Sequence, residues 1–173
     1  MYYVRKLSKT SSLYKIKELD DVKNLCSDFL GQEMRTSENT LSVWRSATLE
    51  GEDLNDAITA ALLASSQVTT SQFLIIDSDA LRDADIQTDD SQLGKTAYIG
   101  FENLHTNLCD LTYEKIGRLL QIYLRACNDE SRTPKIEKDV FKKIILETNA
   151  KGVLNFTELQ EHMQKAVQQI IKP

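Results

Sequence analysis

Two aspartates at the end of an apolar run are the residues with the clearest potential for chemistry. Asp77 and Asp79 follow the run from Phe73 to Ile76 and stand two positions apart. Side chains at i and i+2 of an extended strand end point to the same side, so both carboxylates could hold one divalent cation. The pair supports one hypothesis, a Mg²⁺-dependent phosphoryl-transfer enzyme that uses Asp77 and Asp79.

The sequence DSDAL at 77–81 loosely resembles the first motif of haloacid dehalogenase-type phosphatases. In that motif a Thr or Val stands two places after the second aspartate, whereas this chain has Leu81. No downstream pair of a lysine and an acid on strand ends completes the pattern. A solvated strand exit is therefore the alternative interpretation of the two aspartates.

The stretch ETNAKGVLNFTEL at 147–159 resembles an EF-hand calcium loop between two helices. Glycine stands at its sixth position, an aliphatic residue at the eighth and glutamate at the twelfth. Leu154 occupies the position from which paired loops form a short β contact. The side-chain ligands that the resemblance implies are Glu147, Asn149, Asn155 and Glu158.

Two departures count against a metal in this loop. Glu147 replaces the usual aspartate, and Lys151 puts an ammonium group at the fifth position. At about 4 Å such repulsion is roughly 4 kcal/mol per unit charge product at an effective dielectric near 20. The alternatives are an unrelated turn, an EF-like fragment without metal, and a degenerate calcium-responsive module.

Other catalytic or cofactor-binding patterns are weak. His105 and Cys109 are four apart, which would place both on one face of a helix, but zinc needs further ligands and the chain has only two histidines. The sequence has no P-loop, G-x-G-x-x-G, G-x-S-x-G or H-E-x-x-H motif. We therefore predict no cofactor and no catalytic residue.

Charge is distributed unevenly along the chain. From Glu50 to Gly94 ten acidic residues accompany a single base, Arg82. Such a segment repels nucleic-acid phosphates and favours a protein partner with a basic surface, although acids can also simply solvate a loop and a helix face. The residues that we predict as a binding patch are Asp77, Asp79, Asp83 and Asp85.

These observations favour a small non-enzymatic protein that binds another protein, as an adaptor, an accessory component or an antitoxin-like (immunity) protein. One mechanism would be imitation of phosphate charge toward a nucleic-acid-reading partner. Trp44, the single tryptophan, is either a core residue on a central strand or an interface anchor. We expect no direct nucleic-acid or membrane contact.

Periodicity predicts an α+β fold. The expected strands are 2–7, 41–47, 73–76 and 96–101, with 13–17 left undecided between strand and helix and 80–94 expected as a loop. The expected helices are 19–30, 52–66, 112–127, 137–146 and about 157–171, the last opened by a capping-box spacing from Thr157 to Gln160. This gives a small N-terminal mixed sheet with two helices (1–100), then an all-helical part of about three helices (103–173), either separate or packed on the sheet.

Cysteine usage and hydropathy indicate the compartment. Cys26, Cys109 and Cys127 form no C-x-x-C pair, which is typical of a reducing environment. The N-terminal sequence lacks a signal-peptide core, and no run approaches the length of a membrane span. We expect a cytoplasmic protein.

Overall fold

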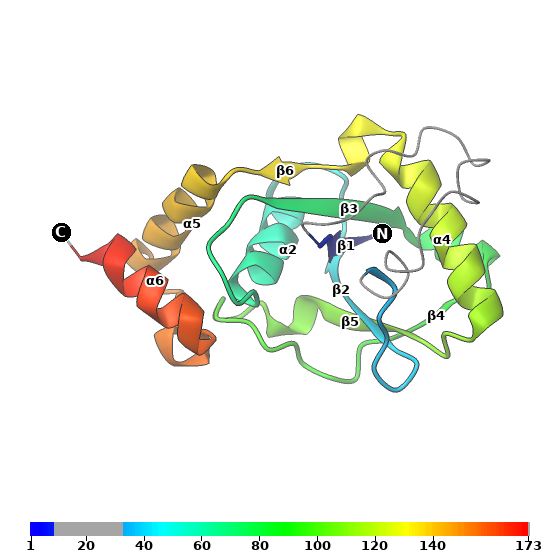
Figure 1. The fold of residues 1–173 in the computed structure, drawn as a ribbon, viewed down its shortest axis with the longest axis horizontal. Coiled ribbons are helices and arrows are strands. Elements are labelled where there is room, and N and C mark those ends of the chain that lie inside the picture. The colour runs from blue at the N-terminus through cyan, green and yellow to red at the C-terminus, as the bar shows by residue number, and fades with distance from the viewer. Residues whose placement is uncertain (9–32, 173) are drawn as a thin grey trace.

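The computed structural model describes residues 1–8 and 33–172 of the chain (Figure 1). The expected helix at 19–30, the undecided segment at 13–17 and Cys26 lie outside these residues. The fold within them is α+β, with strands and helices interleaved along the chain and a C-terminal part that is mostly helical.

A six-stranded antiparallel sheet forms the centre of the described fold, in the order β4-β5-β2-β1-β3-β6. Its strands are β1 (Tyr2–Lys6), β2 (Leu41–Ser46), β3 (Ser71–Asp77), β4 (Gln87–Asp89), β5 (His105–Cys109) and β6 (Lys135–Ile136). The mixed sheet expected from the sequence is thus wrong in its strand directions. Alternation along one strand identifies its buried face, whereas the direction of its neighbours depends on the connections between strands.

Three of the expected strands are confirmed as β1, β2 and β3, and the errors lie elsewhere. The 96–101 segment makes only an isolated bridge, from Tyr98 to Leu154. The region predicted to be all-helical after residue 103 contributes β5 and β6 to the sheet. Strand β5 escaped prediction because its buried positions include Thr106 and Asn107, so it lacks apolar alternation.

Five α-helices lie in the described part of the chain. They are α2 (Glu52–Leu63), α3 (Ser78–Asp83), α4 (Tyr113–Cys127), α5 (Lys138–Ala150) and α6 (Glu161–Ile171). Helix α3 and strand β4 occupy the 80–94 region that we expected as a loop. Helix α6 begins after the predicted capping box, because Thr157 belongs to a short 3-10 helix at Phe156–Glu158. None of the described helices is both long and apolar enough to cross a lipid bilayer.

Helices cover both faces of the sheet (Figure 1). Neighbouring residues of β3 alternate between the two sides, so that Leu74 and Ile76 pack toward α4 whereas Phe73 and Ile75 pack toward α2 and α5. Because both sides are covered, the run from Phe73 to Ile76 is apolar at every position and fully buried. Burying side chains of this size stabilises a fold by about 1.5–3 kcal/mol each.

Candidate functional site: two charged surfaces

The four aspartates predicted as a binding patch surround α3. Asp77 ends β3 and caps the helix, since its Oδ1 accepts a hydrogen bond of 2.9 Å from the backbone N–H of Asp79. Asp79 and Asp83 are exposed on α3 itself. Asp85 follows the helix with a φ of 56°, in the left-handed region that aspartate tolerates better than most residues. Asp77 and Asp85 therefore have local backbone roles besides their charge.

Basic side chains lie beside three of the four carboxylates. The ion pairs join Asp77 to Arg132 (3.6 Å), Asp79 to Arg82 (2.9 Å) and Asp85 to Lys115 (3.7 Å). Such partly exposed pairs stabilise a fold by only about 0–1 kcal/mol each. They nevertheless offset the negative charge, so this patch is less acidic than its own sequence indicates.

A cleft of about 500 Å³ runs between α3 and α4. One side carries the acidic Asp79 and Asp83 of α3, and the other carries the basic Arg118 and Arg125 of α4. The remaining lining residues are Ile76, Asp77, Ala80, Ala84, Gln121, Ile122, Ala126, Asp129 and Arg132. The cleft thus presents both signs of charge beside apolar side chains.

The bonds of Asp77 and Asp79 bear on the magnesium hypothesis. Oδ1 of Asp77 accepts the capping hydrogen bond, and its Oδ2 faces Arg132. Oδ1 of Asp79 faces Arg82. A cation bridging the two carboxylates would have to displace or oppose both guanidinium groups. Within residues 1–8 and 33–172, no group of three or more His, Cys, Asp and Glu side chains is arranged to hold a metal ion.

The loop at 147–158 does join two helices, and it makes a short β contact. Gly152 turns the chain with a φ of 71°. Leu154 then forms an antiparallel bridge with Tyr98, as its position in the EF-hand pattern predicts, although its partner is the irregular 96–101 segment rather than a second loop. The Val153 carbonyl accepts a hydrogen bond of 2.9 Å from Ile99, which holds the loop beside that segment.

The side chains proposed as calcium ligands have other surroundings. Glu147 and Asn149 lie on the exposed last turns of α5, and Glu158 is exposed. Oδ1 of Asn155 accepts hydrogen bonds from the backbone N–H (3.2 Å) and hydroxyl (2.8 Å) of Thr157. Asn155 therefore stabilises the turn into the 3-10 helix, which is a structural role.

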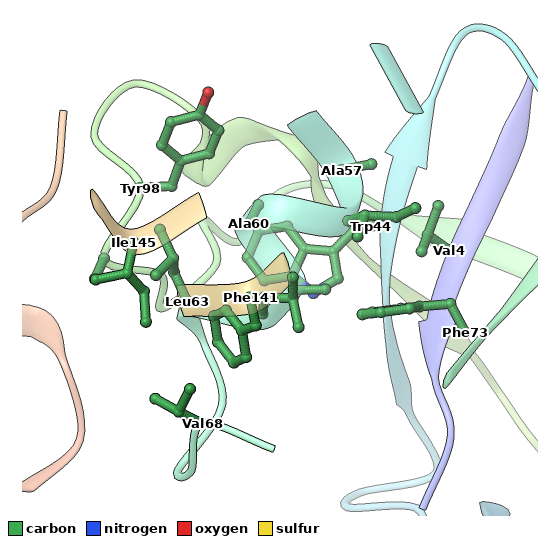
Figure 2. Packing of buried hydrophobic residues seen from close by; sticks show 14 of the residues in the cluster. Val4, Trp44, Ala57, Ala60, Leu63, Val68, Phe73, Tyr98, Phe141 and Ile145 are labelled. Atoms are coloured by element: carbon green, nitrogen blue, oxygen red, sulfur yellow. The ribbon is translucent and has the colours of Figure 1, made fainter. Parts of the chain in front are cut away.

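Trp44 lies in the core and not on the surface, with 6% of its area exposed. Figure 2 shows Trp44 extending from the sheet, where Val4 and Phe73 lie, toward Ala57 and Ala60 of α2. The ring of His105 meets it edge to face, with centroids 5.4 Å apart. In this structure Trp44 anchors the sheet to α2.

His105 and Cys109 lie on strand β5, so their spacing of four residues is not that of one helix face. Burial raises the pKa of the Cys109 thiol, and the carboxylates of Asp89 and Asp110 add to the rise. A thiol with a raised pKa carries little thiolate at neutral pH and is a weak nucleophile. This geometry gives no support to nucleophilic catalysis at Cys109.

A second group of carboxylates surrounds the first turn of α2. We call Glu50, Glu52, Asp53 and Asp56 the α2 acidic surface. Acids at this end of a helix interact favourably with the helix dipole. None of the four forms an ion pair with any other described residue. This surface therefore keeps the negative charge that the patch around α3 largely loses.

Burial, together with neighbouring charge, shifts the pKa values of two groups at this surface. Partial burial raises the pKa of Asp56, and repulsion by Glu52 and Asp53 raises it further against the lowering effects of Tyr98 and Lys151. The Tyr98 hydroxyl donates a hydrogen bond of 2.9 Å to Oδ1 of Asp56. Burial and this carboxylate raise the pKa of Tyr98 to about 12.

A pocket of about 270 Å³ adjoins the α2 acidic surface. Its lining combines Asp53 and Asp56 with the apolar side chains of Met1, Phe101 and Leu104. Arg45 also lines the pocket, but its guanidinium pairs with Asp90 (2.7 Å) and not with these two carboxylates. Phe101 is held in place by stacking on Tyr98, with ring centroids 4.0 Å apart. Carboxylates beside an apolar wall suit a lysine or arginine side chain, whose aliphatic stem packs while its charged end pairs.

No family model matches this chain, and comparisons with characterised proteins and with solved structures also give no match.

The sequence analysis did not identify the basic side chains that line the cleft between α3 and α4. Arg118, Arg125 and Arg132 recur at intervals of seven residues, a spacing that places the first two on one face of α4. This spacing could have predicted a basic row on one face of the helix. Their position opposite the aspartates of α3 depends on the packing of α3 and α4 against the same face of the sheet.

Proposed function

We propose that this protein acts by binding another protein, as a non-enzymatic adaptor, accessory or antitoxin-like component, and that its α2 acidic surface contacts basic side chains of the partner. The observation that supports this proposal is the absence of ion pairs at these four carboxylates within the described residues, next to a pocket with an apolar wall.

The electrostatics favour a basic partner. Carboxylates that repel one another lose that repulsion when a cation lies between them, so a lysine or arginine at this surface stabilises the complex. Complementary charge also accelerates association and makes it sensitive to salt. The pocket beside Asp53 and Asp56 adds apolar contact, which makes the site selective for a long basic side chain over a small cation.

The patch around α3 is a weaker candidate for the same role. A basic partner at Asp77, Asp79 or Asp85 would compete with the ion pairs already present there. Replacing one exposed ion pair by another changes the free energy little. We therefore assign the contact with the partner's basic side chains to α2.

A matched pair of double variants tests this assignment. Glu52→Gln with Asp53→Asn removes two exposed charges from α2, and Asp77→Asn with Asp85→Asn removes two from the patch around α3, where asparagine keeps the cap and the left-handed φ. Asp56 stays intact to keep its hydrogen bond with Tyr98. Affinity for a partner co-purified from the native host is measured by titration calorimetry at low and high salt.

We expect the α2 variant to bind at least about tenfold more weakly and with less salt dependence, and the α3 variant to bind nearly as wild type does. Equal affinity of the α2 variant and the wild type would contradict the proposal. Thermal unfolding of both variants serves as the folding control.

A further inference from the structure

The outward face of α4 has two features that packing among the described residues does not require. Tyr113, in the first turn, is 96% exposed. Among the described residues, no heavy atom lies within 4 Å of the position that a Cβ would occupy at Gly117, one turn further. Glycine inside a helix costs about 1 kcal/mol relative to alanine. A large exposed side chain beside an open position suits close contact with a surface from outside.

Charges of both signs border this face. Arg118 and Arg125 are seven residues apart on α4, hence about 10 Å apart along the helix axis. Asp79 and Asp83 are four residues apart on α3, hence about 6 Å apart. The two rows line the same cleft. Asp79 and Arg118 already form ion pairs within one copy, with Arg82 and Glu114. Within the part of the chain that the structure describes, Asp83 and Arg125 form no ion pair, so these two charges gain most from a second copy.

We infer that two copies of this chain associate through this face about a two-fold axis. We call Asp79, Asp83, Tyr113, Gly117, Arg118 and Arg125 the α3–α4 face. In a two-fold contact the same surface is used twice, so the acidic row of one copy lies over the basic row of the other, and the reverse. A second copy therefore matches both rows, whereas a partner of one charge sign matches only one of them.

The open position at Gly117 fits the same arrangement. Without a side chain there, the backbone of α4 can approach a helix of the second copy closely, and Tyr113 can contribute apolar area at low cost in conformational entropy. Tyrosine and arginine are also the residue types that most often dominate the binding energy of interfaces. This inference does not depend on the α2 acidic surface or on the function proposed for it.

Charge reversal tests the inference with the full chain alone. Sedimentation equilibrium measures self-association of the wild type, of Arg125→Asp and of Asp83→Lys. Each single reversal places like charges opposite each other twice in a two-fold contact, and we expect association at least about tenfold weaker. An equal mixture of the two variants restores opposite charges at both contacts, so we expect it to form heterodimers with near wild-type affinity.

A substitution at Gly117 separates this role from folding. Gly117→Leu introduces a good helix former and should raise the unfolding temperature of the monomer. The same side chain fills the open position, so we expect association at least about tenfold weaker. A purely structural role for this position would not move stability and association in opposite directions.

Three results would overturn the inference. The first is a wild-type chain that remains monomeric up to its solubility limit. The second is a dimer that neither single reversal weakens, and the third is a mixture that fails to restore association although both variants retain wild-type circular dichroism.

Discussion

Replacing Gly94 by alanine should destabilise the fold, because this glycine fits against the single tryptophan. A Cβ added at Gly94 would lie 2.5 Å from Cβ of His105 and 2.7 Å from Cη2 of Trp44. The first atom is attached directly to the backbone of β5, which is paired with β2 and β4. The indole of Trp44 is itself enclosed by the core. Neither neighbour can move without displacing other groups.

The expected magnitude follows from two opposing effects. Adding a methyl group to a well-packed core costs about 1–3 kcal/mol. Replacing glycine by alanine recovers about 0.4–1 kcal/mol, because it restricts the unfolded chain. We therefore expect the free energy of unfolding to fall by roughly 1–2 kcal/mol. For a chain of this size that corresponds to a fall in Tm of about 2–8 °C.

Gly117→Ala is the matched control, since the chemical change is the same and the surroundings differ. Gly117 lies inside α4, and no side chain of the described residues lies within 4 Å of its Cβ position. Alanine should therefore stabilise the helix by about 0.8–1 kcal/mol. Urea unfolding at low protein concentration, followed by Trp44 fluorescence and by far-ultraviolet circular dichroism, measures both variants.

The two substitutions should change the free energy of unfolding in opposite directions, Gly94→Ala lowering it and Gly117→Ala raising it. If Gly94→Ala unfolds at the same urea concentration as the wild type or at a higher one, with an unchanged m value, then this substitution does not destabilise the fold and the prediction is wrong. That result would mean that β5 or the Trp44 indole has freedom to shift that the packing does not indicate.

Three further predictions concern α3, α2 and a buried thiol. Asp77→Ala should lose about 1 kcal/mol in urea unfolding because it removes the cap of α3, whereas Asp77→Asn should keep most of it, since asparagine caps equally well. The pKa of Asp56 is raised in the folded state, so its ionisation destabilises the fold as pH rises above the ordinary value of 3.8. Asp56→Asn should therefore gain stability relative to the wild type over that pH window and keep the gain at neutral pH, and a gain confined to acid pH would contradict the assignment. Burial, with a smaller effect of Glu33, raises the pKa of the Cys127 thiol to about 12. Peptide mapping after alkylation at pH 8 should find Cys127 modified far more slowly in the native protein than in urea, and equal rates would show that the thiol is accessible.

Helices and strands could be predicted from the sequence where one continuous segment carries the whole pattern of apolar residues. The apolar run from Phe73 to Ile76 predicts a strand covered on both sides, and β3 is such a strand. The predicted helix at 112–127 matches α4, whose stripe through Leu120 and Tyr123 is buried, although Tyr113 at the start of the stripe is exposed. In both cases burial of one continuous set of side chains outweighs every other local preference.

Which carboxylates lack a basic neighbour could not be predicted from the sequence, because the ion pairs join residues that are distant in the chain. The sequence places ten acids in one segment, yet Arg132 and Lys115, from distant positions in the chain, lie beside Asp77 and Asp85. The α2 acidic surface receives no such ion pair within the described residues. Coulomb energy depends on distance in space and not along the chain, so the packing of α4 and the strand order of the sheet determine which carboxylates have a basic neighbour.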